Sequence, residues 1–370
     1  MRVLVCADWL LAGPAGRRLA DGAVLVEGSR ISAVGPRATL QARCGDQIRV
    51  LSYPGSTLLP GLIDSHVHLA FDTSADPVGA FQRANPEQLM SDMADRAALA
   101  LRAGVTTIRD LGDNGLAFQV RDEIAAGARA GPRILASGPP LTVAGGHCWF
   151  FGGVVGDDDS VRAMVRRNAA AGADLIKVMA SGGHMTPGGA AMWHSQFTAD
   201  QLRVVVDEAA RAGLRVAAHA HGADAITAAV EAGVHTIEHC GWMSGPGEYD
   251  RREQVARKMA AAGIFACAAL SQGWRGMYDR FGPTRAAQIF ARLPWMDALG
   301  VPVHRRHRCG ATRSGVRRYG RRSGAVLVAR FRQRPHHRVR HCQRSCSPRT
   351  GNSHRPTCPR TGCGPARRRG

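Results

Sequence analysis

Histidines recur in this chain at the ends of short apolar segments. His66 and His68 lie two residues apart in "GLIDSHVHL", His219 follows "RVAA", and His239 closes "HTIEH". Residues two apart on a β-strand point to the same face, so we expect His66 and His68 to project together. Imidazoles that converge from several strands are what a divalent metal site requires, and zinc is commonly bound by such ligands. The pattern therefore predicts a metal centre, most simply a zinc centre.

A lysine lies in a segment that should be buried close to these histidines. Lys177 is one of only two lysines in the chain, the other being Lys258, and it stands in the apolar run "ADLIKVMAS". Burial disfavours the ammonium form, lowers the pKa and leaves a nucleophilic amine. A second interpretation stays open at this point, in which Lys177 pairs with Asp174 or Asp110.

Three further polar residues are candidates for contacts with a substrate. Arg109 ends the segment "VTTIR", His147 lies in the glycine-rich segment "LTVAGGHCWFFGG", and His221 follows His219 by two residues. A glycine-rich loop with aromatic residues is typical of a lid over a site, although an ordinary loop histidine fits His147 equally well. His221 is either a substrate contact or a residue that supports a metal ligand. His235 begins a strand and is interpreted as structural.

A repeated helix-stop signal predicts the elements that position these residues. Segments of helical period, such as Pro86 to Ala103 and Thr198 to Ala212, end in glycine and lead into β-rich runs. Glycine just beyond a helix supplies the left-handed cap that closes it. The seven junctions fall at Gly104, Gly131, Gly172, Gly213, Gly233, Gly263 and Gly300. With the earlier strand "GLIDSHVHL" they give eight strand starts, which predicts an α/β fold of the (β/α)8 TIM-barrel type with its chemistry at the carboxyl ends of the strands.

This arrangement divides the chain into three parts. Residues 1–57 have the short strands and turns of a small N-terminal β-sandwich layer, and residues 58–303 are expected to form the barrel. The eighth strand begins at Val301-Pro302-Val303, where "HRRHRCG" replaces the apolar run that should complete it. We therefore expect a barrel that is incomplete at strand eight, with an open edge between its first and seventh strands, followed by an arginine-rich tail at residues 304–370.

Taken together, the ordered motifs "LLPGLIDSHVHL", "GVTTIRDLG", "SGPPLTVAGGH", "GADLIKVMASGG", "VAAHAHG" and "TIEHCG" resemble the metal-dependent amidohydrolase superfamily. The similarity runs from about Val3 to Val303 and is strongest to the imidazolonepropionase-like and Xaa-Pro dipeptidase-like branch. The resemblance implies hydrolysis of a C–N bond in an amide, cyclic amide or dipeptide by a metal-bound hydroxide. A phosphotriester hydrolase with the same metal ligands is not distinguished from it.

The resemblance also assigns roles to individual residues. It implies that His66 and His68 bind one of two metal ions and that His219 and His239 bind the other. It implies that Lys177, carboxylated by carbon dioxide, bridges the two ions. Lys177 and His239 are thereby the residues closest to the reaction. The family also needs a carboxylate at the end of strand eight to bind metal and shuttle a proton, and this chain has no Asp or Glu after Asp297.

Charge is distributed unevenly along the sequence. The chain has 49 Lys and Arg against 29 Asp and Glu, a net charge of +20, and 20 of the basic residues are arginines after Val303. The segment from His304 to the end contains no acidic residue and no lysine, so the remainder is neutral. One alternative function is thus a non-catalytic protein that binds polyanions through this tail.

The genetic code offers another interpretation of the tail. One permitted codon set for His304 to Gly310 is CAC CGC CGG CAC CGA TGC GGG. Read one base later it encodes Thr-Ala-Gly-Thr-Asp-Ala, which supplies the missing aspartate at the expected place. We therefore interpret residues from about His304 onward as a frameshifted translation with no evolved function. The strands that close the N-terminal layer in the family are then expected to be absent, and hydrolysis by this chain is expected to be very slow.

Partners and location follow from the remaining features. No run of 18 apolar residues occurs, so we expect no membrane contact. The N-terminus has no clear signal-peptide layout, and the cysteines of the first 303 residues are too scattered for a disulfide framework, which favours the cytoplasm. We expect a small-molecule substrate and no specific nucleic acid; self-association into a homo-oligomer stays open.

Overall fold

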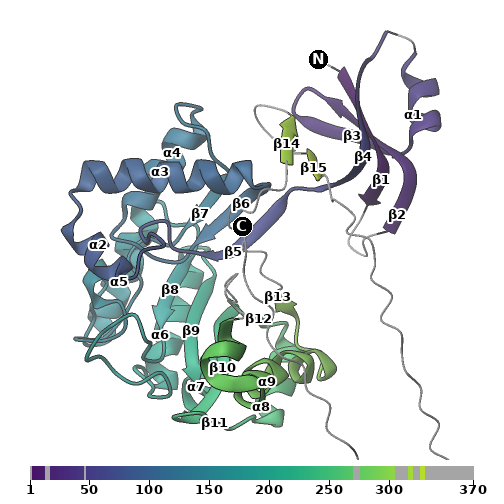
Figure 1. Cartoon of the computed structure of the whole chain (residues 1–370). Helices are drawn as coiled ribbons and strands as arrows, with labels where there is room; N and C mark the ends of the chain where they lie inside the picture. The colour runs from purple at the N-terminus through teal and green to yellow at the C-terminus, as the bar shows by residue number, and fades with distance from the viewer. Residues whose placement is uncertain are drawn as a thin grey trace, which may run out of the picture. The chain divides into compact units, whose positions relative to one another are not determined.

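The computed structural model describes residues 2–12, 17–45, 47–269, 276–304, 316–319 and 326–329 (Figure 1). The N-terminal part forms one six-stranded sheet. Its strands are β1 (Arg2–Ala12), β2 (Arg17–Glu27), β3 (Arg30–Pro36), β4 (Arg49–Pro60), β14 (Val316–Tyr319) and β15 (Val326–Ala329). Their order is β14-β15-β4-β1-β2-β3, with β1 parallel to β4 and antiparallel to β2.

One expectation for this part is wrong. Strands β14 and β15 come from the arginine-rich segment, and β15 pairs antiparallel with β4, so the N-terminal sheet does receive strands from the C-terminal segment. The described residues form a single sheet here, and the β-sandwich layer stays a prediction. One face is covered by helix α1 (Arg37–Cys44), whose Leu40 packs on Leu4, Cys6 and Leu25. A helix can bury a sheet face as well as a second sheet can.

The chemistry-bearing part contains eight parallel strands where the sequence predicts them. They are β5 (Leu62–Val67), β6 (Val105–Asp110), β7 (Arg133–Ala136), β8 (Ile176–Met179), β9 (Val216–Gly222), β10 (Thr236–Gly245), β12 (Phe265–Cys267) and β13 (Val303–His304). They form two sheets, ordered β5-β6-β7 and β13-β12-β10-β9-β8. A parallel bridge between Leu141 and Val178 continues the pairing beyond β7, and β11 (Glu248–Tyr249) forms a hairpin with β10.

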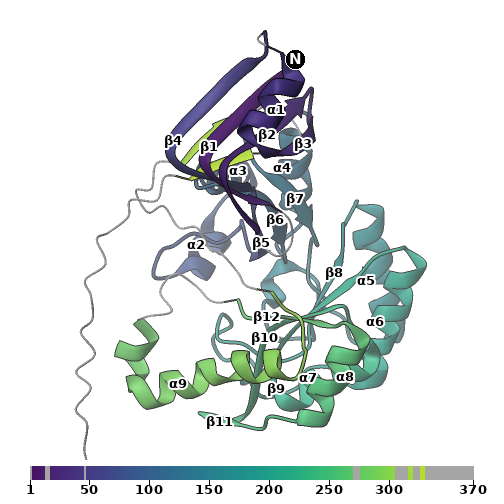
Figure 2. The same cartoon turned by 90° about the vertical axis from the view of Figure 1, so that its right-hand side faces the viewer.

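Helices follow these strands in alternation. They are α2 (Pro77–Arg83), α3 (Pro86–Arg102), α4 (Leu116–Ala125), the 3-10 turn η1 (Trp149–Phe151), α5 (Asp158–Ala170), α6 (Ala199–Arg211), α7 (Ala223–Ala232), α8 (Glu253–Ala262) and α9 (Gly276–Ala298). Helices α5 to α8 lie side by side along one side of β8, β9 and β10 (Figure 2). The fold is therefore α/β, built on parallel strands with helices outside them. In the described part of the chain no strand pairing joins β13 to β5, and a barrel that is incomplete at strand eight stays a prediction.

Local sequence explains where these helices begin and end. Helix α6 starts at a capping box in which Thr198 and Gln201 each satisfy the other's backbone amide. Six of the seven predicted stop glycines adopt positive φ angles between 65° and 91°. Gly131 is the exception: α4 ends at Ala125 instead, and Gly131 is needed because a Cβ there would lie 2.3 Å from the Ile124 side chain.

Candidate metal centre

The histidines predicted as metal ligands gather at the carboxyl ends of three strands. The His66 ring, on β5, lies 5.4 Å from that of His68 and 4.9 Å from that of His239 on β10, centroid to centroid. The ring of His239 lies in turn 4.7 Å from that of His219 on β9. Burial is the main cause that lowers the pKa of His66, His219 and His239 well below the usual range. All three are therefore neutral at pH 7, the form that binds metal.

His68 is held by the turn that follows β6. Its Nδ1 lies 2.8 Å from the backbone oxygen of Gly112. The carboxylate of Asp110 accepts hydrogen bonds from the amides of Gly112 and Leu69, at 3.0 and 2.7 Å. The Asp110 carboxylate therefore links Leu69, the residue after His68, to Gly112, the residue that His68 contacts. This link fixes the path of the backbone at His68.

Lys177 on β8 is almost fully buried, with 1% of its surface exposed, and its Nζ makes no hydrogen bond. Burial lowers the pKa of Lys177 to about 8, against the opposing attraction of the Glu238 carboxylate. Pairing with Asp174 or Asp110 does not occur. Asp174 accepts from Arg121 at 2.9 Å, and Asp110 is engaged by backbone amides. A buried amine without a partner is costly, which favours a modified or metal-associated state.

The backbone of β10 is what turns His239 toward the other histidines. Along a regular strand side chains alternate between faces, so Glu238 and His239 should point in opposite directions. The residues His239, Cys240 and Trp242 instead adopt left-handed conformations, with φ of 65°, 46° and 58°. The pairing of β10 with β9 shifts register at the same place. This break in the alternation lets both Glu238 and His239 approach His66, and such strain is typical of functional sites.

Glu238 is a functional residue that the sequence reasoning missed. Its carboxylate is fully buried and lies 2.8 Å from Nδ1 of His66, and it accepts from Nη2 of Arg109 at 2.6 Å and from Thr236 at 2.7 Å. Burial alone would raise the pKa of Glu238, but Arg109 and His66 hold it well below the usual range. An ionised Glu238 accepts a hydrogen bond from the Nδ1–H of His66. The other ring nitrogen, Nε2, is then free to bind a metal. The one sequence feature that could have identified Glu238 is its position directly before the predicted ligand His239.

Arg109 forms hydrogen bonds inside the protein. Its three guanidinium nitrogens donate to the backbone oxygen of Ser65 and to the side chains of Thr236 and Glu238. The side chain is only 15% exposed. These bonds use three of the five guanidinium donors, so the substrate contact predicted for Arg109 stays a prediction.

Removing the Glu238 carboxylate is expected to destabilise the fold strongly. Glu238→Leu leaves the mostly buried Arg109 charge without its partner, and breaking such a pair costs about 3–5 kcal/mol. The free energy of unfolding from urea titration measures the loss. The control is Glu253→Leu, which breaks an exposed pair with Arg257 and should cost less than about 1 kcal/mol. Equal losses in the two variants would contradict the assignment.

Two other predicted residues, His147 and His221, lie against His219. Their ring centroids are 4.5 and 4.9 Å from that of His219. Burial, with smaller contributions from neighbouring cations, lowers the pKa of each to about 3, so both are neutral. His235 instead accepts a hydrogen bond from the amide of Val216 at 3.1 Å, which fits the structural role expected for it.

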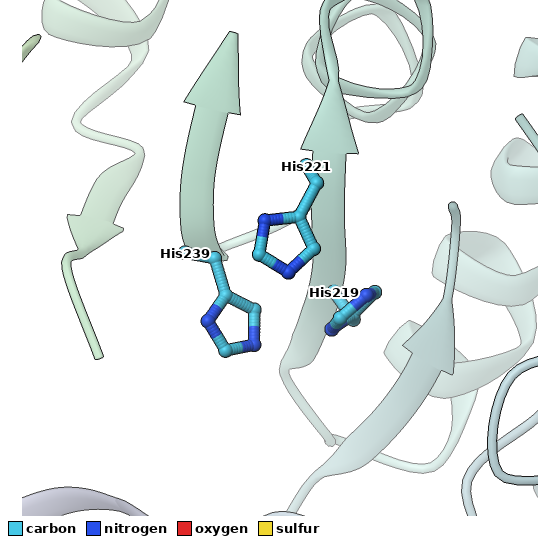
Figure 3. A group of neighbouring side chains, drawn as sticks. All are labelled: His219, His221 and His239. Carbon is cyan, nitrogen blue, oxygen red and sulfur yellow. The ribbon is translucent and has the colours of Figure 1, made fainter. Parts of the chain in front are cut away.

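The donor atoms at this centre fit a divalent metal ion. Ring nitrogens of His219, His221 and His239 lie within 4.8 Å of one another (Figure 3). The ligand atoms of a second group, His66, Glu238 and Cys267, also lie within 4.8 Å of one another. In that group the Glu238 carboxylate already accepts a hydrogen bond from Arg109. Several neutral imidazoles beside one buried, unpartnered amine are a donor set suited to zinc and similar ions.

A cavity adjoins the carboxyl ends of β9 and β10. Its volume is about 690 Å³, which is in the usual range for small-molecule sites. Trp193 and Met243 supply apolar surface, while Asp224 and Arg252 form an ion pair at 2.6 Å in its wall. The cavity can accept a molecule with an apolar group, and the sequence analysis did not identify its lining residues.

Comparisons with known proteins identify the family of this chain. The model of the Amidohydrolase family matches residues 57–269, and that of the bacterial imidazolonepropionase-like composite domain matches residues 22–43. Ochratoxinase of Aspergillus niger is 30% identical over 262 residues, which cover 64% of this chain and 54% of that protein. Imidazolonepropionase of Micrococcus luteus is 36% identical over 141 residues, covering 37% of this chain and 32% of that protein. The chain thus spans about half the length, or less, of these curated relatives.

Two solved structures superpose on this chain. The crystal structure of A. niger ochratoxinase superposes with a TM-score of 0.70 at 26% identity, covering 82% of this chain and 74% of that one. A Xaa-Pro dipeptidase with bound methionine in its active site superposes with a TM-score of 0.69 at 27% identity, covering 82% and 78%. Among the described residues, no helix has both the length and the apolar character needed to cross a membrane.

Proposed function

This chain belongs to the amidohydrolase family, and on that premise we propose that it is built to hydrolyse a C–N bond in an amide, a cyclic amide or a dipeptide with the help of divalent metal ions. The observation that carries the proposal is the convergence of the four predicted histidine ligands. The unpartnered Nζ of Lys177 lies close enough for its charge to contribute to the lowered pKa of His66, His219 and His239. The names of the relatives support the reaction class, and the substrate itself is part of the proposal.

We assign His66 and His68 to one metal ion, and His219 and His239 to a second. Zinc suits this set of neutral imidazoles. When bound, two such ions supply a Lewis acid and a hydroxide nucleophile at neutral pH. The protein's own residues prepare the site: Glu238 orients His66, and the turn at Asp110 and Gly112 holds His68.

Lys177 is proposed to carry a carbamate that bridges the ions. The neutral amine attacks carbon dioxide, a nitrogen–carbon bond forms, and one proton is released to solvent. Burial assists this step because it lowers the pKa of Lys177 to about 8, so that about a tenth of the amine is neutral at pH 7, far more than at the usual lysine pKa. The carbamate carries a negative charge, whereas the ammonium form of Lys177 is a buried cation whose Nζ has no hydrogen-bond partner.

Proton transfer to the leaving amine is the step that this chain is proposed to lack. No Asp or Glu follows Asp297, and residues 305–309, where the shifted frame supplies an aspartate, lie outside the described part of the chain. We propose that the coding sequence is read out of frame from about His304. Sequencing both strands of the gene across the codons for Leu293 to Tyr319 tests this. An inserted or missing base that restores a Thr-Asp motif would show an intact hydrolase, whereas an unchanged frame would mean that the gene itself encodes a truncated relic.

Metal content tests the centre independently of turnover. The purified chain, equilibrated with zinc or manganese and freed of excess ions, is expected to retain about two ions per chain in elemental analysis. His66→Ala and His219→Ala should each lose one. Dipeptides and lactams are the substrates to assay. A chain that retains no divalent metal would contradict the proposed function, whatever its hydrolysis rate.

A further inference from the structure

Three residues at the end of β10 hold a strained backbone conformation. His239, Cys240 and Trp242 have positive φ angles of 65°, 46° and 58°. Residues other than glycine adopt such conformations at a cost in free energy, and the conformations persist only where the surrounding structure over-determines them. This stretch turns the His239 ring toward those of His66 and His219. Whatever holds the backbone here therefore also holds a proposed metal ligand.

Helix α9 supplies contacts to this stretch. It lies beside β10 (Figure 2). Nε of Arg292 donates to the backbone oxygen of His239 at 3.4 Å. One helical turn further along, Sδ of Met296 accepts from Sγ of Cys240 at 3.6 Å and from Nε1 of Trp242 at 3.4 Å. Since residues four apart share one face of a helix, one face of α9 contacts all three left-handed residues.

Arg292 is a buried cation without an acidic partner. Only 6% of its surface is exposed, and within the part of the chain that the structure describes it forms no ion pair with a carboxylate. Its guanidinium donates instead to two backbone oxygens, those of His239 and Ile289. Burying an unpaired charge is costly, so this arginine is not expected to stabilise the fold. Its contact with the backbone of a metal ligand points to a task at the metal centre.

We propose that Arg292 is a positioning residue for the metal ligand His239. The guanidinium charge attracts the His239 carbonyl oxygen and orients the peptide between His239 and Cys240. This contact keeps the backbone in the left-handed turn, which sets the direction of the imidazole. The inference rests on the proposed function, in which His239 binds the second metal ion. It leaves the set of ligands unchanged, because Arg292 acts on the backbone of the ligand and not on the ion.

Arg292→Met tests this role, because methionine fills much of the same space but cannot donate a hydrogen bond. The matched control is Arg285→Met, which makes the same change at an exposed arginine on the same helix. Arg292→Lys keeps the charge but offers only one nitrogen, and it carries the test if Arg292→Met does not fold. The full chain is titrated with zinc against a competing chelator, and the cobalt-substituted protein is followed by its visible absorption. Urea titration gives the free energy of unfolding of the metal-free chain.

The wild-type chain and Arg285→Met are expected to bind two ions with the same affinities. In Arg292→Met the affinity for one ion should fall about 10–100-fold, the usual effect of losing a group that orients a ligand, and the cobalt spectrum should change. Arg292→Lys should show a smaller loss for the same ion. The free energy of unfolding of the metal-free Arg292→Met chain should not fall, because the substitution removes an unpaired buried charge.

A double-mutant cycle shows whether the effect passes through His239. In His239→Ala, which should retain one ion, adding Arg292→Met is expected to leave the affinity for that ion unchanged. A further loss in this background would overturn the proposal. Wild-type affinities for both ions in Arg292→Met and Arg292→Lys would show that Arg292 has only a structural role, although the hydrolase proposal stands. If the wild-type chain binds no metal, both proposals fail.

Discussion

Restoring the frame at His304 is expected to raise the hydrolysis rate by about 10²–10⁴-fold, because that is what a positioned general acid–base group contributes. The change is removal of the first base of the His304 codon, which, with the codon set given above, converts residues 304–309 to Thr-Ala-Gly-Thr-Asp-Ala. The aspartate then falls at the position of Arg308. The rate is measured on dipeptides and lactams, under metal concentrations that load both chains equally.

The matched control carries the same frame with asparagine in place of the new aspartate. Asparagine has nearly the same shape but cannot transfer the proton, so this version should remain as slow as the 370-residue chain. Rapid hydrolysis by the 370-residue chain itself would show that the missing carboxylate is not needed. A fast asparagine version would show that the restored segment acts by another means than proton transfer.

Replacing Lys177 is expected to have the second largest effect. In the frame-restored chain, Lys177→Ala should lower the hydrolysis rate at least about 100-fold and reduce the bound metal from two ions to one, since it removes an anionic ligand shared by both. Propionate should recover part of the rate, because a free carboxylate can occupy the space that the lysine side chain leaves. Metal content and rate are measured with and without propionate.

The chain offers its own control, because Lys258 is its only other lysine and is exposed on helix α8. With ¹³C-labelled bicarbonate, the carbamate signal in ¹³C spectra should persist in Lys258→Ala and disappear in Lys177→Ala. No signal in the wild-type chain would refute the carbamate. Full metal content in Lys177→Ala would remove Lys177 from the set of ligands.

The sequence predicted the order and type of the elements well, because their signals are local. Eight strand starts follow from helix-stop glycines and apolar runs, and all eight strands form. Helix α6 agrees with its predicted bounds because a capping box defines its start. The local signal failed at Gly131, where a glycine required for packing on Ile124 was taken for a helix stop. It also gave no indication of β14 and β15, of which β15 pairs with β4 far away in the chain and β14 pairs with β15.

By itself, the sequence determined which residue types could bind a metal and which strands carry them, since the strand periodicity and strand ends fix where His66, His68, His219 and Lys177 lie. Only the tertiary structure decided how the centre is assembled. The left-handed backbone at His239 overrides strand alternation. Glu238 meets His66 and Arg109 across 172 and 129 residues of sequence. Such contacts depend on which strands become neighbours and how closely they pass, and no local pattern encodes that.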